Sequence, residues 1–270
     1  MIFIRIFASI NANDVNTMSE DTASMNVSES QHRLSYETDP MGRAIKEFFM
    51  TGRAVRLRVF SPMFDEDEIP VKTLFRKEEN MPLIERKALS MTRGRTLDVG
   101  AGAGCHSLAL QQKGVHVCAI DISPLSVETM KLRDVSNVQL MDFFDVKERF
   151  DTILMLMNGI GIVGKVSRMP EFFRHLDNIL QPGGQLLCDS SDISYIFEND
   201  NGVIELPDID GYYGELTYQM QYRDTKGASF PWLYIDADAL RVCAESCGYQ
   251  MEVVQQGEHY DYMARITKKR

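Results

Sequence analysis

A loop of alternating glycines that follows an acid is the part of this 270-residue sequence with the clearest chemistry. Asp98 ends a short apolar run, and Gly100, Gly102 and Gly104 come after it at alternate positions. Glycines at this spacing let the backbone turn sharply and approach a ligand that a Cβ would push away. A dinucleotide-binding loop has the spacing G-x-G-x-x-G and holds a pyrophosphate at a helix start, where a carboxylate is unfavourable. Because the third glycine comes one residue earlier here and Asp98 stands beside the loop, the pattern predicts a ligand that carries positive charge.

A second acid follows at a spacing typical of ribose recognition. Asp121 ends the next apolar run, about 20 residues beyond the first glycine, where a carboxylate can accept hydrogen bonds from both hydroxyls of a ribose. Dinucleotide enzymes share this acid, so it does not distinguish cofactors by itself. Together with Asp98 and the glycine loop, it makes the chain resemble the class I S-adenosylmethionine-dependent methyltransferases, whose first motif is an acid followed by x-G-x-G-x-G. The resemblance covers about residues 94–184 well, the C-terminal strands loosely and the N-terminal segment hardly at all.

The resemblance implies S-adenosylmethionine as the cofactor and suggests which residues hold it. Asp98 is expected near its amino group and sulfonium, and Ile122 is expected against its adenine. Asp142 is expected to accept from the adenine amino group while the backbone N–H of Phe143 completes the contact, and Asp145 is the alternative acid. The predicted cofactor-binding residues are Asp98, Gly100, Ala101, Gly102, Gly104, Asp121, Ile122, Asp142 and Phe143.

The methyl acceptor is less well defined by the sequence. Asn158 follows the fourth predicted strand, where the methyl group should face the acceptor, and is either a weak catalytic candidate or a turn former. The letters N-G-I-G at 158–161 stand where enzymes that methylate amide or adenine nitrogens carry D/N-P-P-Y, so those acceptors are not expected. A small molecule is the expected partner. Arg76, Tyr212 and Trp232 are candidates for holding it, although a core or surface role explains each of them as well.

Strands and helices alternate after the glycine loop, which predicts a parallel sheet. The expected fold is α/β and Rossmann-like: a seven-stranded, mostly parallel, doubly wound sheet with helices on both faces, an antiparallel last strand, an N-terminal cap and an inserted β-hairpin. We expect a disordered extension at 1–35, a cap or lid segment at 36–93, and the methyltransferase domain at 94–270. The hairpin lies at about 211–235, and its strands, 215–222 and 230–235, are expected to be joined through Lys226-Gly227. The acidic run 65–68 is expected to be a solvated loop.

Composition argues against several other classes of protein. The 39 acidic residues outnumber the 29 basic ones, and the formal net charge of −10 disfavours a nucleic-acid-binding surface. No apolar run is long enough to cross a membrane, and five cysteines without a C-x-x-C pair predict reduced thiols, no metal site and a cytoplasmic protein. His106 is expected to pack or cap rather than to act as a base. Two alternatives stay open: a catalytically silent protein that binds S-adenosylmethionine, and a nicotinamide-dependent oxidoreductase, which the glycine spacing and Asp98 oppose.

Overall fold

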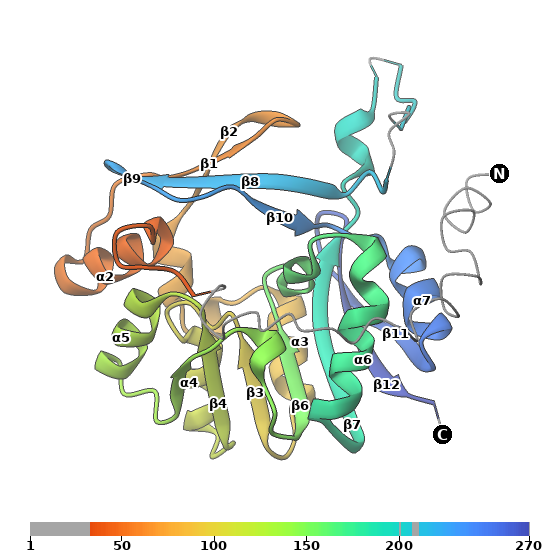
Figure 1. The fold of residues 1–270 in the computed structure, drawn as a ribbon, viewed down its shortest axis with the longest axis horizontal. Coiled ribbons are helices and arrows are strands. Elements are labelled where there is room, and N and C mark those ends of the chain that lie inside the picture. The colour runs from red at the N-terminus through yellow and green to blue at the C-terminus, as the bar shows by residue number, and fades with distance from the viewer. Residues whose placement is uncertain (1–32, 200, 207–210, 270) are drawn as a thin grey trace, which may run out of the picture.

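A seven-stranded sheet forms the centre of the molecule (Figure 1). The computed structural model describes residues 33–199, 201–206 and 211–269. The strands are β3 (Thr96–Val99), β4 (Val117–Asp121), β5 (Val138–Leu140), β6 (Phe150–Met155), β7 (Leu180–Ser191), β11 (Tyr249–Gln256) and β12 (Asp261–Lys268). Their order across the sheet is β11-β12-β7-β6-β3-β4-β5, and β12 runs antiparallel to both of its neighbours. The predicted strand number and the antiparallel last strand are confirmed.

Helices cover both faces of this sheet, as the sequence predicts. The helices are α3 (Leu83–Met91), α4 (Cys105–Gln112), α5 (Pro124–Leu132), α6 (Met169–Ile179) and α7 (Ala237–Ser246). Leu154 of β6 packs with Leu110 of α4 on one face, whereas its neighbour Ile153 packs with Phe172 of α6 on the other. Successive side chains of a central strand therefore enter two different cores, which explains why β6 is apolar throughout. Short 3₁₀ helices are η1 (Val71–Phe75), η2 (Glu78–Asn80), η3 (Phe143–Asp145), η4 (Gly159–Val163), η5 (Val166–Arg168) and η6 (Ser194–Phe197).

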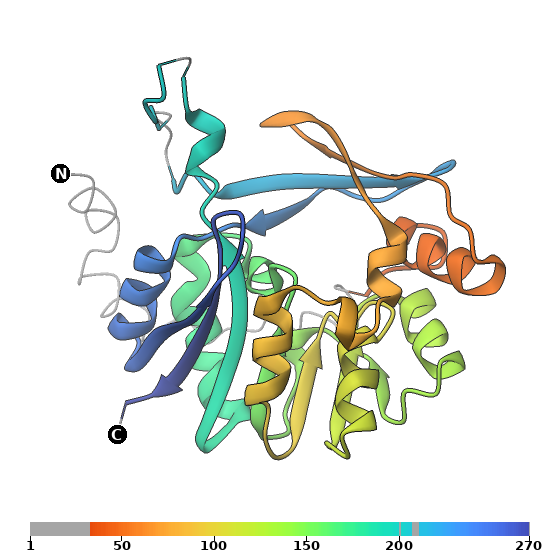
Figure 2. The same ribbon diagram turned by 180° about the vertical axis from the view of Figure 1, so that it is seen from behind.

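A second, smaller sheet lies over the carboxyl ends of the parallel strands, as two opposite views show (Figures 1 and 2). Its strands are β1 (Leu57–Ser61), β2 (Phe64–Ile69), β8 (Glu215–Tyr222), β9 (Thr225–Lys226) and β10 (Phe230–Leu233). The order is β10-β8-β1-β2, and β9 pairs with β8. Because β1 pairs with β8, the N-terminal cap and the inserted hairpin form one sheet although they lie far apart in the sequence.

The expectation that residues 65–68 form a solvated loop is wrong, because this acidic run lies in strand β2. Arg58 is the direct antiparallel partner of Glu68 and also forms an ion pair with Glu66, while Arg56 pairs with Glu68. Opposite charges on adjacent strands stabilise such pairing and offset the low strand propensity of acids. The run is thus an edge strand with a charged outer face, which also protects the sheet edge from pairing with other chains.

The expected hairpin forms, because β10 pairs antiparallel with β8, but its connection through Lys226-Gly227 contains a further short strand, β9, which the sequence analysis did not predict. Strand β8 ends at Tyr222 and β9 begins at Thr225, with Tyr222 directly opposite Thr225. The two-residue turn is therefore Arg223-Asp224, and Arg223 has the left-handed φ of 53° that such hairpin turns require. Lys226-Gly227 lies beyond this turn, where the chain leads towards β10.

Helix α2 (Pro40–Thr51) joins the second sheet to the main domain and begins at Asp39-Pro40, as predicted. The Asp39 side chain accepts from the backbone N–H of Gly42 at 2.7 Å and from the Ser123 hydroxyl at the start of α5. On the inner side of α2, Ile45 packs against Ala103 of the glycine loop. This helix therefore covers the loop and fixes its position relative to the second sheet. Most of the predicted N-terminal extension, residues 1–32, lies outside the described residues.

Candidate active site

The glycine loop connects β3 to α4 at the point where the strand order reverses. Strand β3 pairs with β4 on one side and with β6 on the other, and ligands in open α/β sheets bind outside the carboxyl ends of strands at such a point. Gly100 and Gly102 have φ values of 65° and 57°, which favour glycine. A Cβ built on Gly100 would have no neighbouring atom within 4 Å, so this side of the loop faces open space. The backbone there is free to contact a ligand closely.

Asp98 lies at the base of this loop and is 1 % exposed. Burial raises the pKa of its carboxyl group, although the nearby His106 and Ser107 oppose the shift. The Ser107 hydroxyl donates to Asp98 Oδ2 at 2.6 Å and ties the end of β3 to the first turn of α4. Asp98 therefore fixes the geometry of the loop, and its position beside a ligand's positive charge stays a prediction.

Asp121 ends β4 directly beside the loop. Its Oδ2 accepts from the backbone N–H of Gly102 at 2.8 Å, and its Oδ1 accepts from that of Ser123 at 2.8 Å. Burial raises the pKa of Asp121 to about 6, with smaller raising effects from the carboxylates of Asp39 and Asp98. The two backbone donors aim the carboxylate across the loop, while its remaining lone pairs stay available for hydroxyl donors.

Three further predicted cofactor residues follow the neighbouring strands. Ile122 is 36 % exposed, which is unusual for isoleucine and provides an apolar surface next to Asp121. Asp142 follows β5, and its Oδ1 accepts from the backbone N–H of Phe144 at 2.8 Å. Phe143 is buried, and its carbonyl oxygen lies 2.9 Å from a ring nitrogen of His175. The alternative acid, Asp145, ends the same short helix η3 that Asp142 caps, and its backbone N–H donates to the Asp142 carbonyl at 3.1 Å, so the choice between the two acids stays open.

A buried ionic network below the loop was not predicted. Glu85 of α3 lies 2.9 Å from His106 Nε2 and accepts two hydrogen bonds from the Arg76 guanidinium. Burial would lower the pKa of His106, but Cys105, Glu85 and Asp98 together raise it well above its usual value. His106 is packed, as the sequence suggests, and shares Glu85 with Arg76. The positive charge of Arg76 is thus already balanced within the protein. Nothing in the sequence marks Glu85, because its partners come from other elements.

Asn158 has its side chain fully engaged by the surrounding structure. Its amide nitrogen donates to the carbonyl of Leu233 at 3.1 Å, and its side-chain oxygen accepts from the Ser190 hydroxyl at 2.8 Å. The residue also adopts a left-handed conformation with a φ of 56°, which asparagine tolerates well. Of the two interpretations that the sequence allows, this geometry favours the turn former, which here attaches β10 to the end of β7.

Asp189 is an acid that the sequence analysis did not single out. It lies at the carboxyl end of β7, is 6 % exposed, and its Oδ1 accepts from the backbone N–H of Asn158 at 3.0 Å. Burial raises its pKa to about 7, against the lowering effect of the Asn158 hydrogen bond. Since several strands carry an apolar run followed by a polar residue, only the fold shows that this acid is close to the site.

The remaining acceptor candidates lie in different environments. Tyr212 is buried, and its hydroxyl donates to Asp236 at 2.6 Å at the start of α7, so it belongs to the core. Trp232 is partly buried on β10 and lies against η4, where a Cβ on Gly161 would come within 2.4 Å of the indole ring. Each of the three candidates thus has a structural partner: Arg76 pairs with Glu85, Tyr212 with Asp236, and Trp232 lies against η4.

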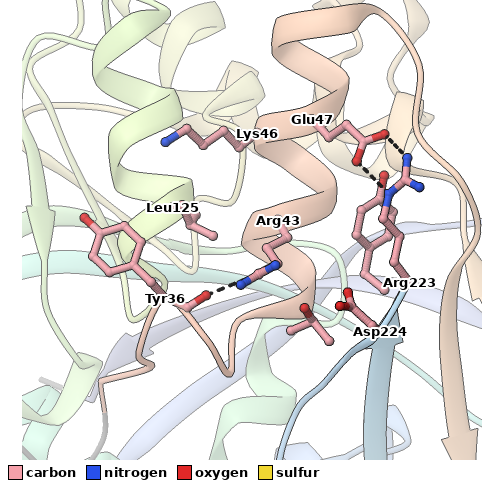
Figure 3. Close-up of a pocket in the computed structure, with 9 residues that line it drawn as sticks. Tyr36, Arg43, Lys46, Glu47, Leu125, Arg223 and Asp224 are labelled. Carbon is pink, nitrogen blue, oxygen red and sulfur yellow. Dashed lines mark hydrogen bonds and ion pairs between the residues drawn. The ribbon is translucent and has the colours of Figure 1, made fainter.

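A separate cavity of about 330 Å³ lies between α2, α5 and the β8–β9 turn (Figure 3). Glu47 and Arg223 form an ion pair across it, and the Arg43 side chain donates to the carbonyl of Tyr36. The residues around it all differ from the predicted cofactor set. The paired charges join α2 to the second sheet.

The described part of the chain has no group of three or more histidine, cysteine or acidic residues placed to hold a metal ion. Across the same residues, no helix combines the length and apolar character needed to cross a membrane.

Comparison with known proteins agrees with this geometry. A family described as a methyltransferase domain matches residues 73–255. A solved structure from Bacteroides fragilis, described as a SAM-dependent methyltransferase in complex with S-adenosyl-L-homocysteine, is 52 % identical, with a TM-score of 0.84 over 90 % of this chain and 100 % of that one. The CcbJ methyltransferase of Streptomyces caelestis is 13 % identical with a TM-score of 0.57 over 87 % of this chain and 100 % of its own, which supports the fold alone.

Two curated relatives match a shorter part of the chain. A cypemycin N-terminal methyltransferase from Streptomyces is 33 % identical over 106 residues, which is 37 % of this chain and 43 % of the relative. A ubiquinone biosynthesis O-methyltransferase from Xylella fastidiosa is 29 % identical over 114 residues, which is 38 % of this chain and 44 % of the relative. The chain thus matches less than half the length of these curated relatives.

Proposed function

The chain belongs to the methyltransferase-domain family, and from this premise we propose that it binds S-adenosylmethionine and transfers the methyl group to a small-molecule acceptor. The observation that carries the proposal is the contact between Asp121 and the backbone of Gly102. This contact places a carboxylate suited to a ribose beside an open glycine turn, at the strand-order reversal. The Bacteroides fragilis relative, whose described complex contains S-adenosyl-L-homocysteine, supports the same cofactor here.

The proposed cofactor site follows the carboxyl ends of three strands. Asp121 would accept from the ribose hydroxyls, and Ile122 would pack against the adenine. Asp142 and the backbone N–H of Phe143 would contact the adenine edge, as the family resemblance implies. Asp98 would lie near the methionine end of the cofactor. The open side of Gly100 supplies the space that such a ligand needs.

The chemistry of the proposed reaction requires mainly positioning from the protein. S-adenosylmethionine supplies a methyl group that is already activated by its sulfonium, so the residues must align it with the acceptor and exclude water. The second sheet lies over the strand ends and covers the side of the site that an acceptor would approach (Figure 2). Asn158 attaches β10 of this sheet to β7 and thereby holds the cover in place.

Thermal unfolding with two ligands tests the cofactor assignment. S-adenosylhomocysteine should raise the unfolding midpoint by mass action, whereas NAD should leave it unchanged. A shift with NAD alone would contradict the proposal. Incubation with methyl-labelled S-adenosylmethionine and pools of small metabolites would then separate a methyltransferase from a silent binder, since only the enzyme transfers label.

A further inference from the structure

Aromatic side chains gather on the face of the second sheet that lies towards the carboxyl ends of the central strands. We call Phe64, Tyr218, Phe230, Trp232 and Tyr234 the aromatic cluster. Tyr218 is its centre, with ring centroids 5.7 Å from Phe64, 6.2 Å from Phe230 and 6.4 Å from Tyr234. The hydroxyls of Tyr218 and Tyr234 lie 3.1 Å apart. Since Trp232 also contacts η4, the cluster extends from the outer sheet down to the strand ends.

Two carboxylates flank this cluster. Asp67 of β2 lies opposite Val59 of β1, and Val59 lies opposite Met220 of β8, so the three side chains share one face of the sheet. Tyr218 precedes Met220 by two residues in β8 and points to the same face. Asp189 approaches from the end of β7. Ser190, the next residue after Asp189, accepts from the backbone N–H of Ile235 at 3.0 Å, and Asn158, which donates to Asp189, also donates to the carbonyl of Leu233 at 3.1 Å. The Asp189 end of β7 therefore lies against the segment that carries Tyr234.

Asp189 has one oxygen that is free for a ligand. Its Oδ1 accepts from the Asn158 backbone, whereas none of the residues described in the structure donates to Oδ2. Among the described residues, the polar side-chain atoms that are both fully buried and without a hydrogen-bond partner are Ser126 Oγ and Arg265 Nε. Asp189 Oδ2 is therefore partly accessible to solvent. A side chain that is 94 % buried with one unpartnered, accessible carboxylate oxygen is poised for a positively charged hydrogen-bond donor.

We propose that the methyl acceptor is an amine, whose ammonium form binds between the Asp189 carboxylate and the aromatic cluster; this inference rests on the proposed methyl transfer. Aromatic faces and carboxylates both attract ammonium ions, and together they select for them. The same acids repel a carboxylate or phosphate acceptor. The charge of Arg76, which would favour such an anion, is already paired with Glu85.

The proton balance of the reaction assigns Asp189 a chemical role. The bound ammonium ion gives one proton to Asp189 Oδ2 and becomes a neutral amine with a free lone pair. This lone pair forms the nitrogen–carbon bond to the methyl group while the carbon–sulfur bond breaks, and its electron pair stays on sulfur as a neutral thioether. The methylated ammonium product then leaves, and Asp189 returns its proton to water.

The surroundings of Asp189 suit this exchange at neutral pH. Burial and Glu85 of α3 raise its pKa, whereas the Asn158 N–H and His106 of α4 lower it, and the result is about 7. Tyr234, beside β10, has a raised pKa and stays a neutral hydroxyl. Tyr262 of β12 pairs with Ser190 on the other face of the sheet, where its hydroxyl donates to the carbonyl of Ile235 at 2.8 Å. A proton acceptor works best when its pKa lies near the working pH.

Calorimetric binding of two cofactor analogues tests this inference without a known acceptor. Sinefungin carries an amine where S-adenosylmethionine carries its methyl sulfonium, and S-adenosylhomocysteine has no charge there. Asp189→Asn should weaken sinefungin binding about tenfold or more, as expected for a lost charge-assisted contact, and leave S-adenosylhomocysteine binding within twofold. Asp192→Asn is the matched control, because Asp192 accepts from Tyr213 and Ser194 near the same strand end and should change neither affinity.

The unmodified protein gives a second measurement that does not depend on a folded variant. Between pH 8 and pH 5.5, sinefungin should lose about tenfold in affinity relative to S-adenosylhomocysteine, because Asp189 becomes protonated while the amine stays charged. A constant ratio across this range, or equal losses of both ligands in Asp189→Asn, would overturn the inference. If S-adenosylhomocysteine failed to bind the unmodified protein at all, the proposed function itself would fall.

Discussion

The two halves of the proposed site, one for the cofactor and one for the acceptor, are built in different ways. The cofactor half, at the carboxyl ends of β3, β4 and β5, consists of loops that follow their own strands, and each side chain is held by backbone groups a few residues away or by the adjacent strand. The acceptor half combines the end of β7 with a sheet whose strands come from residues 57–69 and 215–233. The cofactor half depends on contacts between residues that are close in the sequence. The acceptor half forms only when segments that are far apart in the sequence pair with each other.

The largest effect should come from the buried network beneath the cofactor half. Glu85→Gln removes the negative charge that Arg76 and His106 share and replaces one of its two acceptor oxygens by an N–H donor. The side chains of Arg76 and His106 are only 11 % and 6 % exposed, so water cannot replace this charge. Breaking a buried charge network from one side should reduce the free energy of unfolding by about 3 to 5 kcal/mol, measured by urea denaturation.

An exposed ion pair of the second sheet provides the control for this experiment. Glu68→Gln removes the partner of Arg56 at the surface and should cost less than about 1 kcal/mol. If both variants lost the same free energy of unfolding, the buried network below the glycine loop would contribute no more to stability than a surface ion pair of the second sheet.

The pH dependence of stability should reveal the two raised acids. Burial raises the pKa of Asp189 to about 7 and that of Asp121 to about 6, so the folded protein holds protons that the unfolded chain releases. Stability contributed by these groups is therefore greatest at low pH and is lost as pH rises from about 4 to about 7. In Asp189→Asn, the loss of unfolding free energy between these two pH values should be smaller than in the unmodified protein by about 2 to 4 kcal/mol. A slope equally steep in Asp189→Asn would show that Asp189 does not titrate there.

The cofactor half should lose affinity for its ligand when Asp121, the proposed ribose-binding acid, is replaced. Asp121→Ala should weaken S-adenosylhomocysteine binding by about tenfold to a hundredfold, since each charge-assisted hydrogen bond contributes roughly 1.5 to 3 kcal/mol. Calorimetry measures the change. Asp224→Ala, at the separate cavity of Figure 3, is the control and should bind the ligand within twofold of the unmodified protein. An unchanged affinity in Asp121→Ala would place the ribose elsewhere.

The sequence was sufficient for the central sheet and for the identity of the cofactor, because their signals are local. The glycine loop, the acid that ends β4 and the alternation of strand and helix each depend on neighbours in the chain. The seven strands, the helices on both faces and the antiparallel last strand follow the prediction. Whether each residue binds the cofactor as expected stays a prediction for the binding experiments.

The sequence was insufficient wherever partners come from distant segments. The run 65–68 reads as a loop because its acids have low strand propensity, and only the opposing Arg56 and Arg58 make it a strand. Glu85 reads as a surface residue of an amphipathic helix until α3 packs on α4. Asp189 likewise becomes a candidate site residue only because the second sheet lies next to it in the fold. Tertiary pairing decides all three, and no periodicity encodes it.

The smallest expected effect tests how independent the two halves are. Tyr218→Phe keeps the ring at the centre of the aromatic cluster and removes the hydroxyl that bonds to Tyr234. We expect the free energy of unfolding to fall by about 0.5 to 1.5 kcal/mol in urea denaturation, while calorimetry should find S-adenosylhomocysteine affinity within twofold. Tyr36→Phe, at a tyrosine that is 53 % exposed, is the control and should change both quantities less. A large loss of S-adenosylhomocysteine affinity in Tyr218→Phe would mean that the second sheet helps to bind the cofactor, and the division into a cofactor half and an acceptor half would no longer hold.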